Sequence, residues 1–338
     1  ILCKGISFAR VSYVKWYVHS ILMKGDDKMN YSVFKEKLIT ELKKLFPESE
    51  ISEGEVSKNN TTFYDTVTIR APGQIISPCI RLNDYYRRFN SQMENERSFA
   101  KVLEGICDEY WSTLEHTGYK DKIINEITNF NDIKDHITCR LVNRAMNQAL
   151  LDTMPHENYL GEFAVIYSVI IKQGDEGVES VRITNSLMNH WKISSHDLYE
   201  LALNNTVKLF PKVSMPMEDM IRSMIGAPMP EREAEVGMMY ILTNEQGING
   251  ATVLIYPGLL KELISQYGIK ERYLYILPSS IHEVILVPTE NLSMTENYRQ
   301  MVRDVNYSEV AAEEILSNQI IIYDCNEDTI QCLVKEEE

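Results

Sequence analysis

The feature of this sequence that most constrains the fold is a run in which apolar residues take every second position. The run covers residues 162–172, and its apolar members are Phe163, Val165, Tyr167, Val169 and Ile171. Successive side chains of a β-strand point to opposite faces, so this spacing predicts a strand with one buried face. Gly174-Asp175-Glu176-Gly177 predicts a turn, and residues 178–184 predict a returning strand. We therefore expect an antiparallel hairpin at the centre of a sheet, with Tyr167 in the core.

Helical and strand patterns follow each other along the rest of the chain. Helices are expected at residues 31–46, 96–116, 144–154, 195–208, 258–267, 295–305 and 308–316. Strands are expected at residues 50–56, 62–69, 75–82, 136–143, 236–243, 251–256, 273–277, 283–287, 319–323 and 329–334. Short turns join neighbouring strands, which favours antiparallel pairing. The predicted fold class is α+β in two halves, each a mostly antiparallel sheet with packed helices.

Residues 212–235 are expected to separate the two halves. Pro216, Pro228 and Pro230 make this stretch loop-rich, because proline interrupts helices and sheets. The predicted domains are an N-terminal α+β domain at residues 29–211 and a C-terminal α+β domain at residues 236–338. Between them, residues 212–235 are a linker or a methionine-rich excursion.

Methionines gather around this linker. They are Met215, Met217, Met220, Met224, Met229, Met238 and Met239. Flexible thioether side chains adapt to irregular surfaces, so the region from Met215 to Met239 is a candidate surface for a protein partner. The plainer alternative is a helix whose stripe of Met217, Met220 and Met224 packs on the core. The sequence leaves both alternatives open.

Residues 1–28 differ in charge from the rest of the chain. They carry five basic and two acidic residues, whereas the whole chain has a formal net charge of -15. Lys24-Gly25-Asp26 can be encoded by a purine-rich ribosome-binding sequence just upstream of the Met29 codon. We expect translation to start at Met29, so that residues 1–28 are an upstream or disordered segment. The alternative is a targeting segment, although the stretch lacks a continuous apolar core.

The acidic balance narrows the classes of partner. A net charge of -15 repels nucleic-acid phosphates and anionic lipid heads, so we expect neither nucleic acid nor a membrane as a partner. The six cysteines form no CxxC pair, which is typical of reduced thiols in the cytosol. The sequence predicts a cytoplasmic protein, and none of its motifs requires a cofactor or a metal.

One short segment combines serine, histidine and a carboxylate between two apolar strands. It is Pro278-Ser279-Ser280-Ile281-His282-Glu283. A histidine can activate a serine as a nucleophile, which suggests a hydrolase. The candidate catalytic residues are Ser279, Ser280, His282 and Glu283. The plainer interpretation is a β-turn, and Glu283 is badly placed to orient His282 because neighbours on a strand point to opposite faces.

Four segments taken together carry a family resemblance. They are residues 76–86, 143–156, 202–206 and 275–286. They resemble an uncharacterised bacterial family, a domain of unknown function found largely in anaerobic gut bacteria. The resemblance covers nearly all of residues 29–334. It implies no catalytic residues, because the family brings no known activity with it.

Two classes of function remain after these exclusions. We expect a non-catalytic binding or regulatory protein, because paired catalytic motifs are missing and the chain is acidic. The alternative is a hydrolase-type enzyme that uses the Ser279, Ser280, His282 and Glu283 turn. A structure distinguishes the two, because an enzyme needs a pocket in which its catalytic side chains converge.

Overall fold

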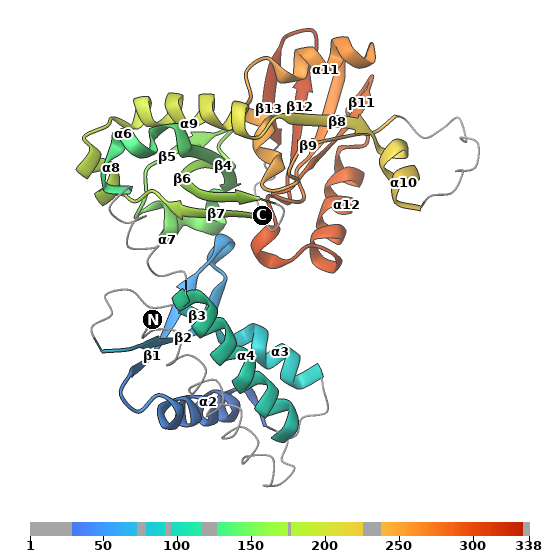
Figure 1. Cartoon of the computed structure of the whole chain (residues 1–338). Coiled ribbons are helices and arrows are strands. Elements are labelled where there is room, and N and C mark those ends of the chain that lie inside the picture. The colour runs from blue at the N-terminus through green and yellow to red at the C-terminus, as the bar shows by residue number, and fades with distance from the viewer. Residues whose placement is uncertain are drawn as a thin grey trace. The chain divides into compact units, whose positions relative to one another are not determined.

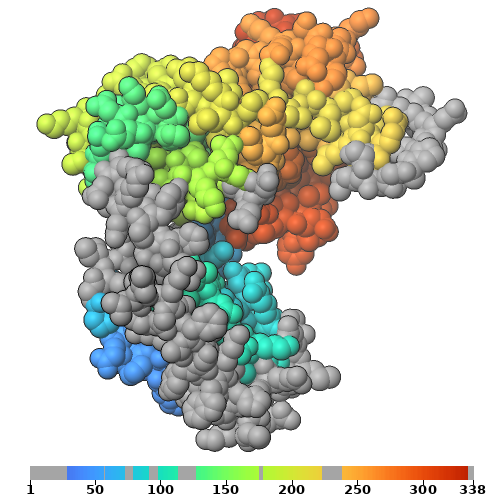
Figure 2. All heavy atoms as spheres, in the orientation of Figure 1, coloured from blue at the N-terminus to red at the C-terminus, as the bar shows by residue number. Residues whose placement is uncertain are grey.

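The computed structural model describes residues 29–72, 79–91, 96–115, 127–174, 177–225 and 238–333, which are coloured in Figures 1 and 2. The predicted upstream segment at residues 1–28 lies outside them. The chain folds into two compact units. The described residues up to Lys58 and from Phe63 to Glu115 form the smaller unit, and Asn59–Thr62 together with the described residues from Ile127 form the larger unit. The domain bounds drawn from the sequence at 212–235 stay a prediction.

The smaller unit packs helices on a three-stranded antiparallel sheet. Its strands are β1 (Glu50–Ser57), β2 (Phe63–Arg70) and β3 (Cys79–Arg81), in the order β1-β2-β3. Its helices are α2 (Tyr31–Leu45), α3 (Leu82–Ser91) and α4 (Glu96–Glu115). Asn30 caps α2, because its side chain accepts a hydrogen bond from the backbone N–H of Val33. The core is rich in aromatic contacts, among them Phe34 with Phe89.

The first sheet of the larger unit contains the predicted hairpin. Its strands are β4 (Ile137–Asn143), β5 (His156–Tyr159), β6 (Phe163–Gly174) and β7 (Gly177–Arg182). The other three strands each pair antiparallel with β6. β6 is central, with β4 on one side and both β5 and β7 on the other. Val169 pairs with Val181, which confirms the predicted pairing of the two strands. Residues 163–169 are buried on both faces, whereas we expected only one.

Short helices surround this first sheet. They are α6 (Phe130–Ile133), η2 (Lys134–His136), η3 (Ala145–Asn147), α7 (Gln148–Leu151), α8 (Asn185–Trp191) and α9 (Ser195–Leu209). Leu151 of α7 packs with Val142 and Ile166, which explains why the second face of β6 is also buried. The longest of these helices, α9, is capped by Ser194, whose hydroxyl accepts a hydrogen bond from the Asp197 N–H.

The second sheet of the larger unit has six antiparallel strands. They are β8 (Lys212–Pro216), β9 (Tyr240–Asn244), β10 (Tyr273–Leu277), β11 (Val284–Thr289), β12 (Ile320–Asp324) and β13 (Thr329–Leu333). Their order is β13-β12-β10-β11-β9-β8. Helix α11 (Leu259–Tyr267) covers one face and α12 (Thr295–Ser308) the other, as Figure 1 shows. The α+β class with mostly antiparallel sheets is therefore confirmed.

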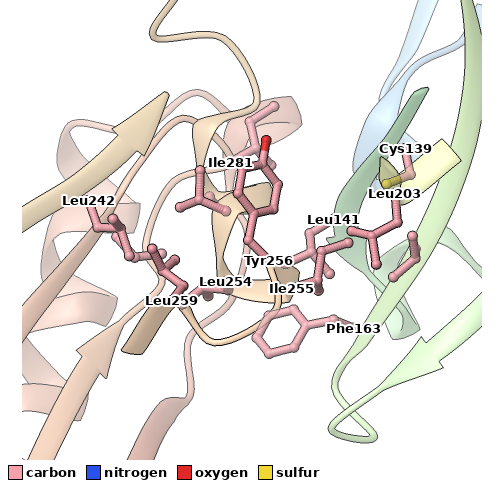
Figure 3. Packing of buried hydrophobic residues seen from close by; sticks show 14 of the residues in the cluster. Cys139, Leu141, Phe163, Leu203, Leu242, Leu254, Ile255, Tyr256, Leu259 and Ile281 are labelled. Carbon is pink, nitrogen blue, oxygen red and sulfur yellow. The ribbon is translucent and has the colours of Figure 1, made fainter. Parts of the chain in front are cut away.

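One apolar cluster joins the two sheets of the larger unit. It combines Leu141 and Phe163 of the first sheet with Leu242 of the second. Between them lies η4 (Gly250–Ile255), whose Leu254 and Ile255 point into the same cluster in Figure 3. The larger unit is thus one packed body.

Three sequence predictions in the larger unit are wrong. Residues 251–256, expected as a strand, form the 3-10 turn η4. Residues 308–316, expected as a helix, contain only η5 (Ala312–Glu314), and residues 212–216, expected as loop, form the edge strand β8. A short apolar run that is buried all round gives no periodicity to separate strand from helix, and this explains the error at η4.

Part of the region from Met215 to Met239 forms a strand and a helix, and residues 226–237 lie outside the described residues. Met215 lies in β8, and Met217 begins helix α10 (Met217–Ile225). Met229 lies outside the described residues. Met238 is exposed, while Met239 packs against the cluster under α12. A role of this region in binding a partner stays a prediction.

No helix in the described ranges is both long enough and apolar enough to cross a membrane.

Candidate functional site

The segment from Pro278 to Glu283 connects β10 to β11, as the sequence predicts. Ser280 is buried, and its Oγ accepts a hydrogen bond from the backbone N–H of His282 at 2.9 Å. The carbonyl oxygen of Ser279 accepts a hydrogen bond from the N–H of Leu316 at 3.0 Å. The Ser280 hydroxyl therefore stabilises the turn itself, and the Ser279 backbone is tied to the segment that follows η5.

The His282 imidazole faces a neighbouring loop and an acidic residue. Its Nδ1 lies 3.1 Å from the carbonyl oxygen of Gly247 and 3.4 Å from the backbone nitrogen of Asn249. Its Nε2 lies 3.4 Å from Oε1 of Glu314. Nδ1 donates to Gly247 when it carries a proton and accepts from Asn249 when it does not. The ring is thus tied to the segment that follows β9.

Nothing in this geometry activates a serine. Across the described stretches of the chain, no serine hydroxyl bonds the His282 ring. The carboxylate that approaches the ring is Glu314 of η5, and it does not come from the neighbouring Glu283. The hydrolase alternative therefore gains no support from the turn, because a nucleophilic serine needs a base within hydrogen-bond reach.

A different group of side chains converges at the free edge of β4. A small pocket of about 60 Å³ lies there, which we call the β4 pocket. None of the four predicted catalytic residues lines it. Its lining comes from β4, β6, β7, the end of α9 and the segment that runs from the end of β9 into η4. The polar lining residues that matter for its chemistry are Thr138, Arg140, Ser168, Ser180, Asn249 and Thr252.

Strand register explains why Thr138, Arg140 and Ser168 share one face of the first sheet. Cys139 and Leu141 belong to the apolar cluster, so the alternating Thr138 and Arg140 lie on the opposite face. Thr138 pairs with Ser168, and Ser168 pairs in turn with Arg182. The apolar face thus closes the core, and the polar face is left for the pocket.

Two threonines close the outer edge of β4 beside the pocket. Oγ1 of Thr206 accepts a hydrogen bond from the N–H of Cys139 at 2.8 Å. Oγ1 of Thr252 accepts one from the N–H of Leu141 at 3.2 Å. These bonds replace the partner strand that an edge lacks, and they hold α9 and η4 against β4.

Arg140 lies in a largely buried strand but makes few hydrogen bonds. Its Nη1 lies 3.5 Å from Oδ1 of Asn249, at the outer limit of a hydrogen bond. Its Nε is sealed from solvent and has no hydrogen-bond partner in the described part of the chain. Among the residues with described positions, no carboxylate forms an ion pair with Arg140. A guanidinium carries five N–H donors, so most of the Arg140 donors have no acceptor among the described residues.

Arg140 and the nearby Arg182 give the pocket a positive charge. Burial, together with the charge of Arg182, lowers the pKa of Arg140 to about 10. Burial also lowers the pKa of Arg182. Arg140 is therefore still a cation at neutral pH, held in an environment that makes its charge costly.

The segment after β9 forms the wall of the pocket opposite Arg140. The side chain of Asn244 donates to the carbonyl oxygen of Ile248 at 2.8 Å and shapes this turn. Asn249 has a positive φ of 50°, a left-handed conformation that asparagine tolerates better than most residues. Its side chain bonds Arg140, while its backbone N–H reaches His282. The turn at His282 thus supports the pocket wall from behind.

Sequence reasoning missed this site, although one signal was present. Arg140 stands inside the run Ile137–Asn143, whose other members are apolar or small. A single arginine in a buried strand needs a partner or a function. The other lining residues give no such signal, because they are spread over more than a hundred positions of sequence.

The described residues contain no group of three or more His, Cys, Asp or Glu side chains that could hold a metal ion. The fold and the β4 pocket define a two-unit α+β protein with a small polar pocket in its larger unit. The chain belongs to a family of unknown function, DUF5688, whose model matches residues 31–325. This confirms the resemblance to a domain of unknown function. No curated protein and no solved structure matched the chain.

Proposed function

We propose that this protein is a non-catalytic, regulatory binding protein of the bacterial cytoplasm, and that the β4 pocket holds its small-molecule ligand. The observation that carries the proposal is the convergence of polar side chains from five segments on one pocket. Pockets that bind ligands are concave and place a few polar groups where they fix the ligand, and the β4 pocket brings such groups together.

The lining of the pocket favours binding over chemistry. Its one thiol is that of Cys139, and burial raises the pKa of this thiol to about 12. A thiol with such a pKa stays protonated at neutral pH and is a poor nucleophile. The hydroxyl of Thr206 is already bonded to the N–H of Cys139 and to the carbonyl oxygen of Ala202.

The proposal is tested by blocking the pocket from its rim. Ser180 lines the pocket and is exposed, so Ser180→Trp places an indole over the opening. Glu179→Trp on the same strand is the matched control, because neighbouring side chains point to opposite faces. The full chain is screened against small metabolites by its thermal unfolding midpoint.

We expect ligands that raise the midpoint of the wild type and of Glu179→Trp but not of Ser180→Trp. Each ligand is then recovered and weighed by mass spectrometry. An unchanged ligand supports binding without chemistry, whereas a converted ligand makes the protein an enzyme. A ligand that binds Ser180→Trp as tightly as the wild type removes the β4 pocket as the site.

A further inference from the structure

We propose that the β4 pocket binds a small oxyanion, a carboxylate or phosphate group, through the Arg140 guanidinium. This inference rests on the proposed function and names the ligand class of the same pocket. Arg140 is a partly buried cation with one long hydrogen bond and no carboxylate partner in the described chain. Buried charges are otherwise paired, so the missing acceptor points to a ligand that supplies it.

The shape of the guanidinium fits this class of ligand. Its planar fork of N–H groups matches two oxygens of a carboxylate or phosphate, and such charge-assisted pairs are among the strong hydrogen bonds of proteins. Asn249 fixes the fork from one side through Nη1. An oxyanion that meets the remaining donors neutralises a charge that burial makes costly.

Neighbouring groups add donors for the other oxygens of the anion. The hydroxyls of Ser168 and Ser180 line the same pocket: Ser168 lies in the cross-strand row next to Arg140, and Ser180 lies one row further along the sheet. Arg182 stands directly across from Ser168 and contributes a second positive charge to this face. An oxyanion with three or four oxygens can use such a set of donors.

The net charge of -15 does not oppose this site. Surface charges more than about 8–10 Å away are largely screened at physiological salt, whereas a partly buried arginine is screened much less. A single small anion therefore responds to Arg140 and Arg182. A nucleic acid, with many phosphates spread along the surface, responds to the overall negative charge. The size of the pocket, about 60 Å³, agrees with one anionic group.

The test compares two arginine variants of the full chain. Arg140→Gln removes the guanidinium, and Arg222→Gln removes an exposed guanidinium on α10, where it pairs with Asp219. The two variants change the net charge equally. Inorganic phosphate and acetate are titrated separately, at constant ionic strength balanced with sodium chloride, and the thermal midpoint is followed.

We expect a saturable rise of the midpoint in the wild type and in Arg222→Gln, of roughly 5 °C or more at about a hundredfold excess over the dissociation constant. The rise is expected to vanish in Arg140→Gln. A response to phosphate alone assigns a phosphorylated ligand, and a response to acetate alone assigns a carboxylate; both support the proposal. An equal rise in all three proteins, or no rise with either anion, overturns it.

The midpoint without added oxyanion is a second readout. If the acceptor for Arg140 is a bound anion, the free protein holds an unpaired buried charge at this position. Arg140→Gln removes that charge, so it should unfold at the same temperature as the wild type or higher. A clearly lower midpoint shows instead that Arg140 has a structural partner, and it counts against the proposal. If Arg140→Gln does not fold, Arg140→Lys takes its place. It keeps the charge but loses the fork, and an unchanged phosphate affinity then overturns the inference.

The proposed function and the oxyanion can fail separately. An uncharged metabolite that is blocked by Ser180→Trp but still binds Arg140→Gln keeps the β4 pocket as a binding site. That result overturns only the proposal that the ligand is an oxyanion.

Discussion

Gly250 lies directly against the backbone of His282. A Cβ atom at Gly250 would overlap the carbonyl oxygen of His282 and Oγ1 of Thr243. The same carbonyl oxygen accepts a hydrogen bond from the Thr243 hydroxyl at 2.7 Å. This close approach brings the wall of the β4 pocket against the turn between β10 and β11, and only glycine permits it.

Gly250→Ala is therefore expected to destabilise the protein by about 1–3 kcal/mol, because backbone must move to admit the methyl group. Gly174→Ala is the matched control, since a Cβ at Gly174 meets nothing within 4 Å. We expect that control to stay within about 0.5 kcal/mol of the wild type. Urea unfolding of both variants measures the difference, and equal stabilities would show that the close approach is not made.

Tyr167 allows its ring and its hydroxyl to be tested separately. The side chain is fully buried, and its hydroxyl has no hydrogen-bond partner among the described residues. Tyr167→Ala should cost about 3–5 kcal/mol, because it leaves a large cavity in the core. Tyr167→Phe should be neutral or stabilise by about 1 kcal/mol, because it removes an unsatisfied polar group. Unfolding free energies check both values, and a loss above about 1 kcal/mol for Tyr167→Phe would reveal a hidden partner of the hydroxyl.

Thr206 is expected to stabilise β4 through its oxygen. Its Oγ1 accepts from the Cys139 N–H at 2.8 Å, so Thr206→Val leaves a buried backbone donor without a partner. The expected cost is about 1–3 kcal/mol, although the two side chains have nearly the same shape. Thr206→Ser keeps the oxygen and serves as the control for the lost bond. Unfolding free energies compare the two variants. If Thr206→Ser is the more damaging, packing of the methyl group matters more than the bond.

The cysteines should differ sharply in reactivity. Cys79 is exposed, whereas Cys107 and Cys139 are buried, and burial raises the pKa of each buried thiol to about 12. Only thiolate reacts, and a raised pKa makes it scarce at about pH 8. Brief treatment of the native protein with iodoacetamide should therefore modify Cys79 well before Cys107 and Cys139. Peptide mass spectrometry reads the order, and early modification of Cys139 would show that the β4 edge opens readily.

The sequence predicts an element correctly when the residues that determine the element are close to one another in the chain. The strand at Tyr273–Leu277 has the predicted bounds, and α2 is one residue shorter than predicted. Both are set by side-chain periodicity and by nearby caps or turns, which short stretches of sequence contain. The short strand β5 was missed, because its four residues obtain their pairing from β6 and not from a pattern of their own.

The candidate site could not be predicted from the sequence, because its residues are far apart in the chain. Ser280 and His282 are close in sequence and attract attention, but their hydrogen bonds only shape a turn. Arg140 and Asn249 are 109 positions apart, and their contact depends on how η4 packs against β4. No pattern along the chain can report a contact that forms only when two sheets are brought together by a shared core.

The sequence by itself determined the α+β class, the β6–β7 hairpin and the acidic charge, because alternation, turn chemistry and charge are properties of neighbouring residues. Only the tertiary structure decided where polar groups converge. It placed Arg140 on the face opposite the core and set Asn249 against it. Burial then left that guanidinium short of acceptors, and burial is a property of the packed molecule that no local stretch of sequence specifies.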